Sequence, residues 1–128
     1  MFDLRAGSPD TRKTILVVDD DRQILNFVSL ILIDHEYNVL TATSGREALE
    51  VSREHEASID LLLSDFQMPG MSGVELATEL SSERPAIKVL LMSGFPDGIL
   101  VLNEGWHFLA KPFITSQLCA LISGLTTN

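Results

Sequence analysis

The sequence has little cysteine, few aromatic side chains and no long apolar run. Its single cysteine, Cys119, cannot form a disulfide within the chain and excludes a zinc site built from several cysteines. The longest apolar stretch, Ile24 to Ile33, is interrupted by Asn26 and Ser29 and is too short to span a bilayer. The first residues lack the basic and then apolar pattern of a signal peptide. We therefore expect a soluble, cytoplasmic protein without membrane insertion.

Basic residues are also scarce. The chain has 9 Lys plus Arg against 18 Asp plus Glu, a formal net charge of −9. This charge repels phosphate backbones, so we expect no direct binding of nucleic acid. With 128 residues and 45% hydrophobic content, the chain is long and apolar enough for one domain with a buried core. Residues 1–12 contain Gly7 and Pro9 without apolar periodicity, which predicts a flexible N-terminal segment.

After this segment, short apolar runs alternate with stretches of helical periodicity. No two runs are joined by a hairpin signal, which favours βαβ units with right-handed crossovers. The pattern therefore predicts an α/β protein, a doubly wound parallel sheet covered by helices on both faces. The five expected strands are Ile15–Val18, Tyr37–Ala42, Ile59–Ser64, Ile87–Met92 and Trp106–Ala110.

Polar residues predict where several of the intervening helices begin. The helix that runs from Ile24 to Asp34 is expected to be capped by Asp20 or Asp21. Ser44 and Ser72 are each followed by a glutamate three residues later, the spacing of a capping box. These caps predict one helix start soon after the second strand and another after the loop, Phe66 to Met71, that follows the third strand.

The pattern is weaker after the fourth strand. Between Pro96 and Gly105 we expect only a short helix. The last helix is expected to be capped by Thr115 or Ser116 and to end at Gly124.

Four polar features follow four of the predicted strands. Asp19–Asp21 follows the first strand, Asp65 the third, Ser93 the fourth and Lys111 the fifth. In an open α/β sheet, binding sites form beyond the carboxyl ends of the strands. We therefore expect these side chains, far apart in the sequence, to meet at one edge of the sheet.

The chemistry of this set points to phosphoryl groups and a hard cation. Two carboxylates about 4 Å apart repel each other by roughly 4 kcal/mol at an effective dielectric constant of 20. Oxygen ligands without cysteine or histidine select Mg²⁺ or Mn²⁺, which would relieve that repulsion. The Lys111 ammonium and the Ser93 hydroxyl could then hold the oxygens of a phosphoryl group. Asp65 stands alone at its strand end and is the candidate nucleophile.

Each of these residues taken alone also has an ordinary structural explanation. An aspartate after a strand often caps a helix, as Asp20 or Asp21 would here. Asp65 precedes a Pro-Gly loop and could simply form a turn. Only the joint arrangement indicates a functional site.

In the same segments the chain resembles the receiver domains of two-component response regulators. The resemblance covers about residues 13 to 124, and we expect the receiver domain to occupy 13–125. Its D-x-x-M-P-x-M-x-G loop together with a distant K-P-F is specific to this family. The matching segments are Ile15–Asp21, Leu63–Gly73, Leu90–Gly94 and Phe108–Phe113.

The resemblance implies a fold and a reaction. The sheet would have the strand order 2-1-3-4-5 of flavodoxin and CheY. Asp65 would accept a phosphoryl group from a histidine kinase or a histidine phosphotransfer protein. The carboxylates of Asp20 and Asp65 and the backbone carbonyl of Gln67 would bind Mg²⁺ or Mn²⁺, and Asp19 would act through a water on the metal. The family catalyses only its own phosphorylation and dephosphorylation and is not otherwise an enzyme.

The resemblance also implies roles for residues around the phosphoacceptor. Ser93 would bond a phosphoryl oxygen and Lys111 would neutralise another. Phe108 occupies the position of the family's aromatic switch residue, which changes a surface that binds a downstream protein. The Lys111–Pro112 peptide bond would be cis.

Two departures from the family pattern carry information. The segment between Ser93 and Lys111 is shorter than usual, so the fourth helix, on the face that the family uses for output, is expected to be shortened. The sequence from Gly105 to Phe113 resembles the corresponding segment of receiver domains that are fused to sensor kinases. The sequence ends soon after the last helix, at Asn128, so we expect no attached output domain; the chain would either act alone by docking or be one piece of a larger protein.

Two other classes of function remain as alternatives. Asp19 and Asp21 form the D-x-D of haloacid dehalogenase phosphohydrolases, although Arg22-Gln23 follows instead of a small β-branched residue. The shortened helix would also suit an interaction module that works without phosphorylation. Dependence on Asp19 but not Asp65 would favour the hydrolase, and independence from Asp65 would favour the module.

Overall fold

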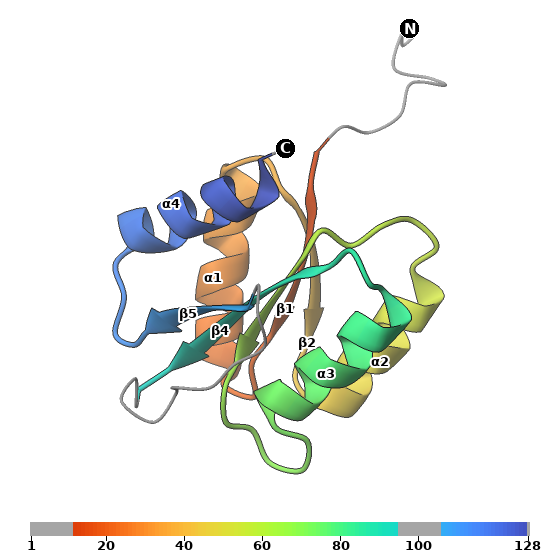
Figure 1. Cartoon of the computed structure of the whole chain (residues 1–128). Helices are drawn as coiled ribbons and strands as arrows, with labels where there is room; N and C mark the ends of the chain where they lie inside the picture. The colour runs from red at the N-terminus through yellow and green to blue at the C-terminus, as the bar shows by residue number, and fades with distance from the viewer. Residues whose placement is uncertain (1–11, 95–105, 128) are drawn as a thin grey trace, which may run out of the picture.

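A computed structural model describes residues 12–94 and 106–127 of the chain (Figure 1). Strands and helices alternate through these residues. The strands are β1 (Thr14–Val18), β2 (Asn38–Ala42), β3 (Leu61–Asp65), β4 (Lys88–Ser93) and β5 (Trp106–Ala110). The helices are α1 (Arg22–Asp34), α2 (Gly45–Glu54), α3 (Gly73–Glu83) and α4 (Thr115–Thr126).

The five strands form one parallel sheet with the order β2-β1-β3-β4-β5. Helices α1 and α4 cover one face of the sheet, and α2 and α3 cover the other (Figure 1). The predicted doubly wound fold and its strand order 2-1-3-4-5 are therefore confirmed. This order places the carboxyl ends of β1 and β3 side by side.

The central strands are apolar on both faces because both faces are covered by helices. In β1, alternate side chains enter two separate cores: Leu16 packs with α2 and α3, whereas Ile15 packs with α1 and α4. Leu62 and Leu63 of β3 divide in the same way. This buried sheet is the rigid platform from which the polar strand ends project.

Side-chain caps begin three of the helices. The Asp21 carboxylate accepts from the backbone N–H groups of Gln23 at 2.9 Å and Ile24 at 3.3 Å, so Asp21 rather than Asp20 caps α1. A complete capping box begins α3, because Ser72 accepts from Glu75 N at 3.1 Å and donates its own N–H to Glu75 Oε1 at 2.9 Å.

At α2 only half of the predicted capping box forms. The Ser44 hydroxyl accepts from Glu47 N at 3.1 Å, as expected. The Glu47 carboxylate, however, accepts from the backbone N–H and the hydroxyl of Thr43, one residue before the cap. These two hydrogen bonds lower the pKa of Glu47. The threonine offers two donors where the Ser44 backbone offers one, which favours this arrangement.

The ends of the last helix differ from the prediction. Helix α4 starts directly after Ile114, whose N–H donates to Gln117 Oε1 at 3.1 Å, so neither Thr115 nor Ser116 is the cap. The helix also continues through Gly124 to Thr126. Its buried face continues beyond the glycine, and this burial outweighs the roughly 1 kcal/mol that glycine costs in a helix.

Helix α1 is apolar on more than its buried side. Its buried residues are Leu25, Val28 and Leu32. Three further large apolar side chains point outward, with exposed fractions of 55% for Phe27, 67% for Leu30 and 55% for Ile33. The apolar periodicity of this helix therefore includes an exposed stripe besides the core stripe.

Two predicted features lie outside the residues that the structure describes. One is the flexible N-terminal segment, residues 1–12, of which only Arg12 is described. The other is the short fourth helix expected between Pro96 and Gly105. Among the helices within 12–94 and 106–127, none has the length and apolar character needed to cross a membrane.

We expect the Ser72→Ala substitution to lower the free energy of unfolding by about 1 kcal/mol, because the first turn of α3 loses a capping hydrogen bond. Ser82→Ala is the matched control, since Ser82 is an exposed residue of the same helix. Urea denaturation of both variants measures the difference. Equal effects of the two substitutions would show that the capping box does not stabilise the domain.

Candidate functional site

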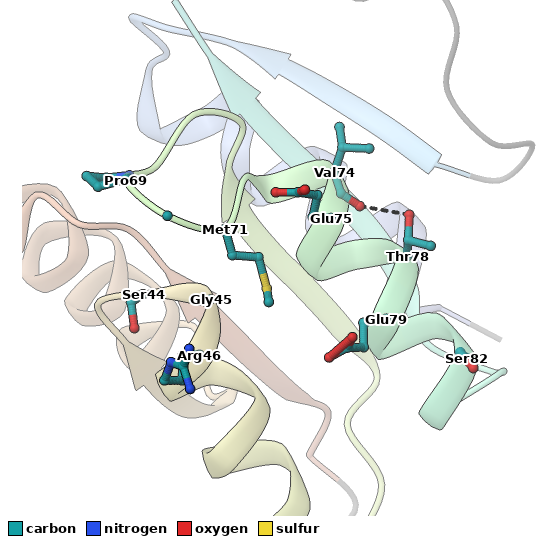
Figure 2. Close-up of a pocket in the computed structure, with 11 residues that line it drawn as sticks. Ser44, Gly45, Arg46, Pro69, Met71, Val74, Glu75, Thr78, Glu79 and Ser82 are labelled. Carbon is teal, nitrogen blue, oxygen red and sulfur yellow. Dashed lines mark hydrogen bonds between the residues drawn. The ribbon is translucent and has the colours of Figure 1, made fainter.

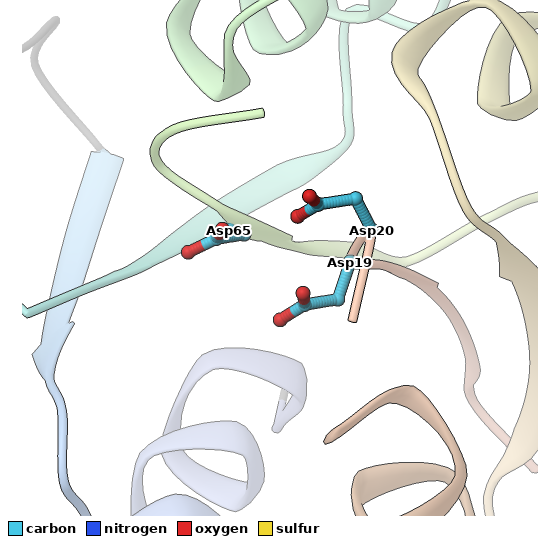
Figure 3. Close-up of side chains that lie close together, drawn as sticks. All are labelled: Asp19, Asp20 and Asp65. Atoms are coloured by element: carbon cyan, nitrogen blue, oxygen red, sulfur yellow. The ribbon is translucent and has the colours of Figure 1, made fainter. Parts of the chain in front are cut away.

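Three carboxylates gather at the carboxyl ends of β1 and β3. Asp19 and Asp20 directly follow β1, and Asp65 is the last residue of β3. Each can offer an oxygen such that all three oxygens lie within 4.8 Å of one another. Figure 3 shows the three side chains converging from the two strand ends. The parallel pairing of β1 with β3 produces this cluster from residues far apart in the sequence.

The three aspartates differ in burial. Asp19 is almost fully buried, with 1% of its surface exposed, whereas Asp20 is exposed and Asp65 is partly buried. The Asp19 carboxylate accepts from the N–H of Asp21 at 2.9 Å, and its own N–H donates to the carbonyl of Ala42 at 3.2 Å. Asp19 is thus fixed from both sides, while Asp20 faces solvent.

Lys111 brings positive charge to the cluster from β5. Its Nζ lies 3.0 Å from Asp65 Oδ1 and 3.4 Å from Asp19 Oδ2. The backbone N–H of Lys111 donates to the carbonyl of Ser93 at 2.7 Å, which fixes the residue beside the end of β4. The Lys111–Pro112 peptide bond is cis, as the resemblance implied.

The electrostatics follow from burial and these ion pairs. Desolvation raises the pKa of Asp19 and outweighs the hydrogen bond from Asp21 and the attraction of Lys111. Desolvation also disfavours the Lys111 ammonium, but the carboxylates of Asp65 and Asp19 overcome it, so the pKa of Lys111 is raised. The two pKa shifts are consistent with each other. Lys111 has two carboxylates beside it, which favour its charged form, whereas Asp19 has one ammonium, Lys111, and a second carboxylate, Asp65, beside it.

The cluster has the composition of a site for a hard cation. One ammonium stands against three carboxylates, so negative charge remains uncompensated at the end of the sheet. The donors are all oxygens, and the exposed carboxylate of Asp20 gives access from solvent. Mg²⁺ and Mn²⁺ are the ions that such ligands prefer.

The other predicted site residues surround this cluster. Ser93 ends β4 and is buried, one residue after Met92, the register partner of Asp65. Gln67 lies two residues beyond Asp65 in the loop before α3, with an exposed side chain. Phe108 lies in β5, partly buried, beside Leu91 of β4.

The structure adds an aromatic contact that the sequence reasoning missed. The ring of Phe66, the residue after Asp65, meets the ring of Phe108 edge to face, with centroids 6.4 Å apart and planes at 88°. The N–H of Phe66 donates to the carbonyl of Met92 at 2.7 Å, which holds this residue against β4. The spacing of two phenylalanines gives no sign of such a contact across the sheet.

An apolar hollow beside Lys111 was also missed. It has a volume of about 470 Å³ and is open to solvent. Helix α1 carries more apolar residues than one buried stripe requires, and this excess is the sequence signal that could have predicted the hollow. The lining residues are Ile24, Phe27, Gly94, Lys111, Pro112 and Phe113.

In the absence of divalent cations, we expect Asp19→Asn to raise the melting temperature more at pH 7 than at pH 4. The reason is that the pKa of Asp19 is raised by folding. As pH rises above the ordinary value of 3.8, the unfolded chain loses this proton first, so wild type loses stability that the asparagine variant keeps. Thermal unfolding in a chelator at pH 4 and pH 7 measures the gap.

The matched control is Asp21→Asn, which removes the same charge from an exposed residue and keeps the cap of α1. This control should not raise the melting temperature at pH 7. A stabilisation by Asp19→Asn that was equal at the two pH values would contradict the explanation.

Comparisons with known proteins agree with this geometry. The model of the response regulator receiver domain matches residues 15–123. The transcriptional regulatory protein ZraR of Escherichia coli is 42% identical over 112 residues, 84% of this chain and 25% of that protein. The sensor kinase CckA of Brucella abortus is 34% identical over 113 residues, 85% of this chain and 12% of that protein. The chain thus spans a quarter or less of the length of these two relatives.

A solved structure supports the same conclusion. The response regulator protein TrrA of Thermotoga maritima, in complex with Mg²⁺ and BeF, has a TM-score of 0.78 and 30% sequence identity. The match covers 88% of this chain and 98% of that one. The fold, the acidic cluster with its lysine and the family match agree, and the chain belongs to the response regulator receiver domain family.

Proposed function

We propose that Asp65 is the phosphoacceptor of this receiver domain. The observation that carries the proposal is the position of Lys111 Nζ, 3.0 Å from Asp65 Oδ1, inside a cluster of three carboxylates. Asp65 is the member of this cluster that ends a central strand of the sheet and is partly exposed. Asp19 is buried, which makes it a poor acceptor for a group delivered from solvent.

The reaction requires an attacking carboxylate and a leaving group. An oxygen of Asp65 forms a bond to the phosphorus of a phosphohistidine, and the P–N bond breaks. The electron pair of that bond stays on the ring nitrogen, and neutral imidazole leaves because the other ring nitrogen of the phosphohistidine already carries a proton. With acetyl phosphate as donor, a P–O bond breaks and acetate leaves. The Lys111 ammonium is placed to offset the charge of a phosphoryl oxygen on Asp65.

The metal requirement follows from the same cluster. Asp20, Asp65 and the backbone carbonyl of Gln67 would hold Mg²⁺ or Mn²⁺, and Asp19 would act through a water on the metal. When bound, the cation supplies positive charge against the carboxylates and the phosphoryl oxygens. The similarity to the response regulator protein TrrA, whose structure was solved in complex with Mg²⁺ and BeF, supports this proposal.

The readout of phosphorylation would lie between β4 and β5. Ser93 at the end of β4 would bond a phosphoryl oxygen, and Phe108 would repack in response. Because Phe66 directly follows Asp65 and touches the Phe108 ring, the two aromatics connect the acceptor with the switch residue. The repacked surface would bind a downstream protein, and the net charge of −9 argues against nucleic acid as that partner.

We further propose that the domain acts on no substrate other than its own phosphoryl group. The hydrolase alternative needs Asp21 as a second catalytic carboxylate. In the structure the Asp21 side chain caps α1 and accepts two backbone N–H groups. This use as a helix cap disfavours the hydrolase.

The partner that supplies the phosphoryl group is proposed to be a histidine kinase or a histidine phosphotransfer protein. A donor must reach Asp65 beside Lys111, where the apolar hollow between α1 and the Pro112–Phe113 turn lies open. Phe27, 55% exposed, borders this hollow and offers an apolar contact to a docking protein. The similarity to the sensor kinase CckA supports a place as one domain of a larger sensor kinase.

We expect acetyl phosphate with Mg²⁺ to add about 80 Da, the mass of HPO₃, to the wild-type protein in intact-mass spectrometry. Asp65→Asn should lose the adduct, since the amide is not a nucleophile. Asp60→Asn is the control, because Asp60 lies outside the cluster and its carboxylate accepts from Thr14 N at the other end of β1. An adduct that persists in Asp65→Asn would refute the assignment. Turnover of p-nitrophenyl phosphate that needs Asp19 but not Asp65 would restore the hydrolase alternative.

We expect Phe27→Ser to slow phosphorylation by a phosphohistidine protein that is active on wild type, by about tenfold, a loss typical of a docking hot spot. Labelling by acetyl phosphate should not change, because this small donor needs no docking surface. Ile33→Ser is the matched control, since Ile33 lies on the same helix, is also 55% exposed and does not border the hollow. Equal slowing by both variants, or slowing with acetyl phosphate as well, would show that the hollow does not receive the donor.

A further inference from the structure

The loop from Phe66 to Ser72 follows Asp65 and is anchored to the sheet by the Phe66 N–H, which donates to the Met92 carbonyl, and to the core by the buried side chain of Met68. Two further contacts position its C-terminal part. Directly after the loop, Gly73 packs so closely against the backbone of Asp65 that a Cβ on Gly73 would clash with the Asp65 carbonyl oxygen. Near the end of the loop, Met71 packs against Gly45, the first residue of α2. The contact of Gly73 with Asp65 joins the two ends of the loop, whereas the contact of Met71 with Gly45 joins the loop to a different helix, α2.

The contact between Gly45 and Met71 leaves no room for a side chain on the glycine. A Cβ on Gly45 would lie 2.7 Å from Met71 Sδ and 2.9 Å from both Cβ and Cγ of Met71. A new rotamer could move the sulfur, but the Cβ of Met71 is fixed to the loop backbone. Either the loop or the start of α2 would therefore have to shift. Figure 2 shows Met71 reaching from the loop toward the start of α2.

Neither partner of this contact can yield freely. Met71 is partly buried and packs against the core that α2 and α3 form with the sheet. The start of α2 is fixed by the Ser44 hydroxyl on Glu47 N and by the bonds from Thr43 to the Glu47 carboxylate. The preceding strand, β2, is in turn bonded to the site, because the Asp19 N–H donates to the Ala42 carbonyl.

The same short stretch of chain thus touches both halves of the proposed metal site. Through Ala42 it fixes Asp19, and through Gly45 and Met71 it fixes the loop that carries Gln67. Pro69 and Gly70 of the loop line an open groove of about 920 Å³ between α2 and α3 (Figure 2), whereas Met68 of the same loop is buried in the core.

We propose that Gly45 is a positioning residue for cation binding: its missing side chain lets Met71 seat on α2, which sets the place of the Gln67 carbonyl relative to Asp20 and Asp65. The inference rests on the proposed function, in which that carbonyl is a ligand. Groups that orient metal ligands from behind typically change affinity by about 10- to 100-fold when they are altered.

The test measures Mg²⁺ affinity by isothermal titration calorimetry, together with the melting temperature. Gly45→Ala should weaken Mg²⁺ binding by about tenfold. Gly124→Ala is the matched control: it is also a helical glycine, a Cβ there meets nothing within 4 Å, and it should leave the affinity unchanged. Met71→Ala, which removes the contact from the loop side, should weaken binding by a smaller factor.

The double variant Gly45→Ala/Met71→Ala isolates the contact. Once Met71 is shortened, the added Cβ of residue 45 has room, so the double variant should bind Mg²⁺ within about twofold of Met71→Ala alone. This comparison holds even where Gly45→Ala alone is too unstable to titrate, because the affinity of Met71→Ala against wild type still measures the loop's dependence on the contact.

The possible results distinguish the positioning role of Gly45 from the proposed function of the domain. Lower melting temperatures with unchanged Mg²⁺ affinity in Gly45→Ala and Met71→Ala would overturn the positioning role and leave the proposed function intact. Absence of Mg²⁺ binding in wild type would overturn both. Loss of affinity in Gly45→Ala that persists unchanged on the Met71→Ala background would show that Met71 is not the residue through which Gly45 acts.

Discussion

The ion pairs of Lys111 with Asp65 and Asp19 are the interaction on which the site end of the molecule depends. The parallel sheet brings the ends of β1 and β3 together, and with them carboxylates that repel each other. At about 4 Å and an effective dielectric constant of 20, one such pair costs roughly 4 kcal/mol. The ammonium at 3.0 and 3.4 Å offsets part of this cost. The negative charge that it leaves uncompensated is the basis of the proposed cation site.

The fixed and the movable parts of the site are separate. Asp65 ends a strand that is paired on both sides, and Asp19 is buried and bonded through its backbone to Ala42. The proposed phosphorylation of Asp65 would therefore add charge to a rigid frame. The backbone of Phe66 is bonded to β4 and its ring meets the ring of Phe108 in β5, so this aromatic contact is the route by which the proposed change would reach β5.

The sequence was sufficient for the strand order and for the meeting of the acids, because both follow from parallel βαβ connectivity. It was insufficient where local signals compete with tertiary packing. Gly124 predicts a helix end, yet the buried face of α4 extends to Thr126. Ser44 and Glu47 have capping-box spacing, but the Glu47 carboxylate accepts instead from the backbone N–H and the hydroxyl of Thr43. The contacts of Phe66 with Phe108 and of Met71 with Gly45 join separate elements, so spacing along the chain carries no trace of them.

The long separation of the site residues has a consequence for how the protein is made. Lys111 is 46 residues after Asp65 and 92 after Asp19. On the ribosome the acids therefore emerge well before the base that balances them, and β4 remains an unpaired edge until β5 is synthesised. The final strand pairs with this edge of β4 and brings the ammonium that offsets part of the charge of the acids. A nascent chain that stops before this point carries the acids without their ammonium at one end of a sheet that lacks its fifth strand.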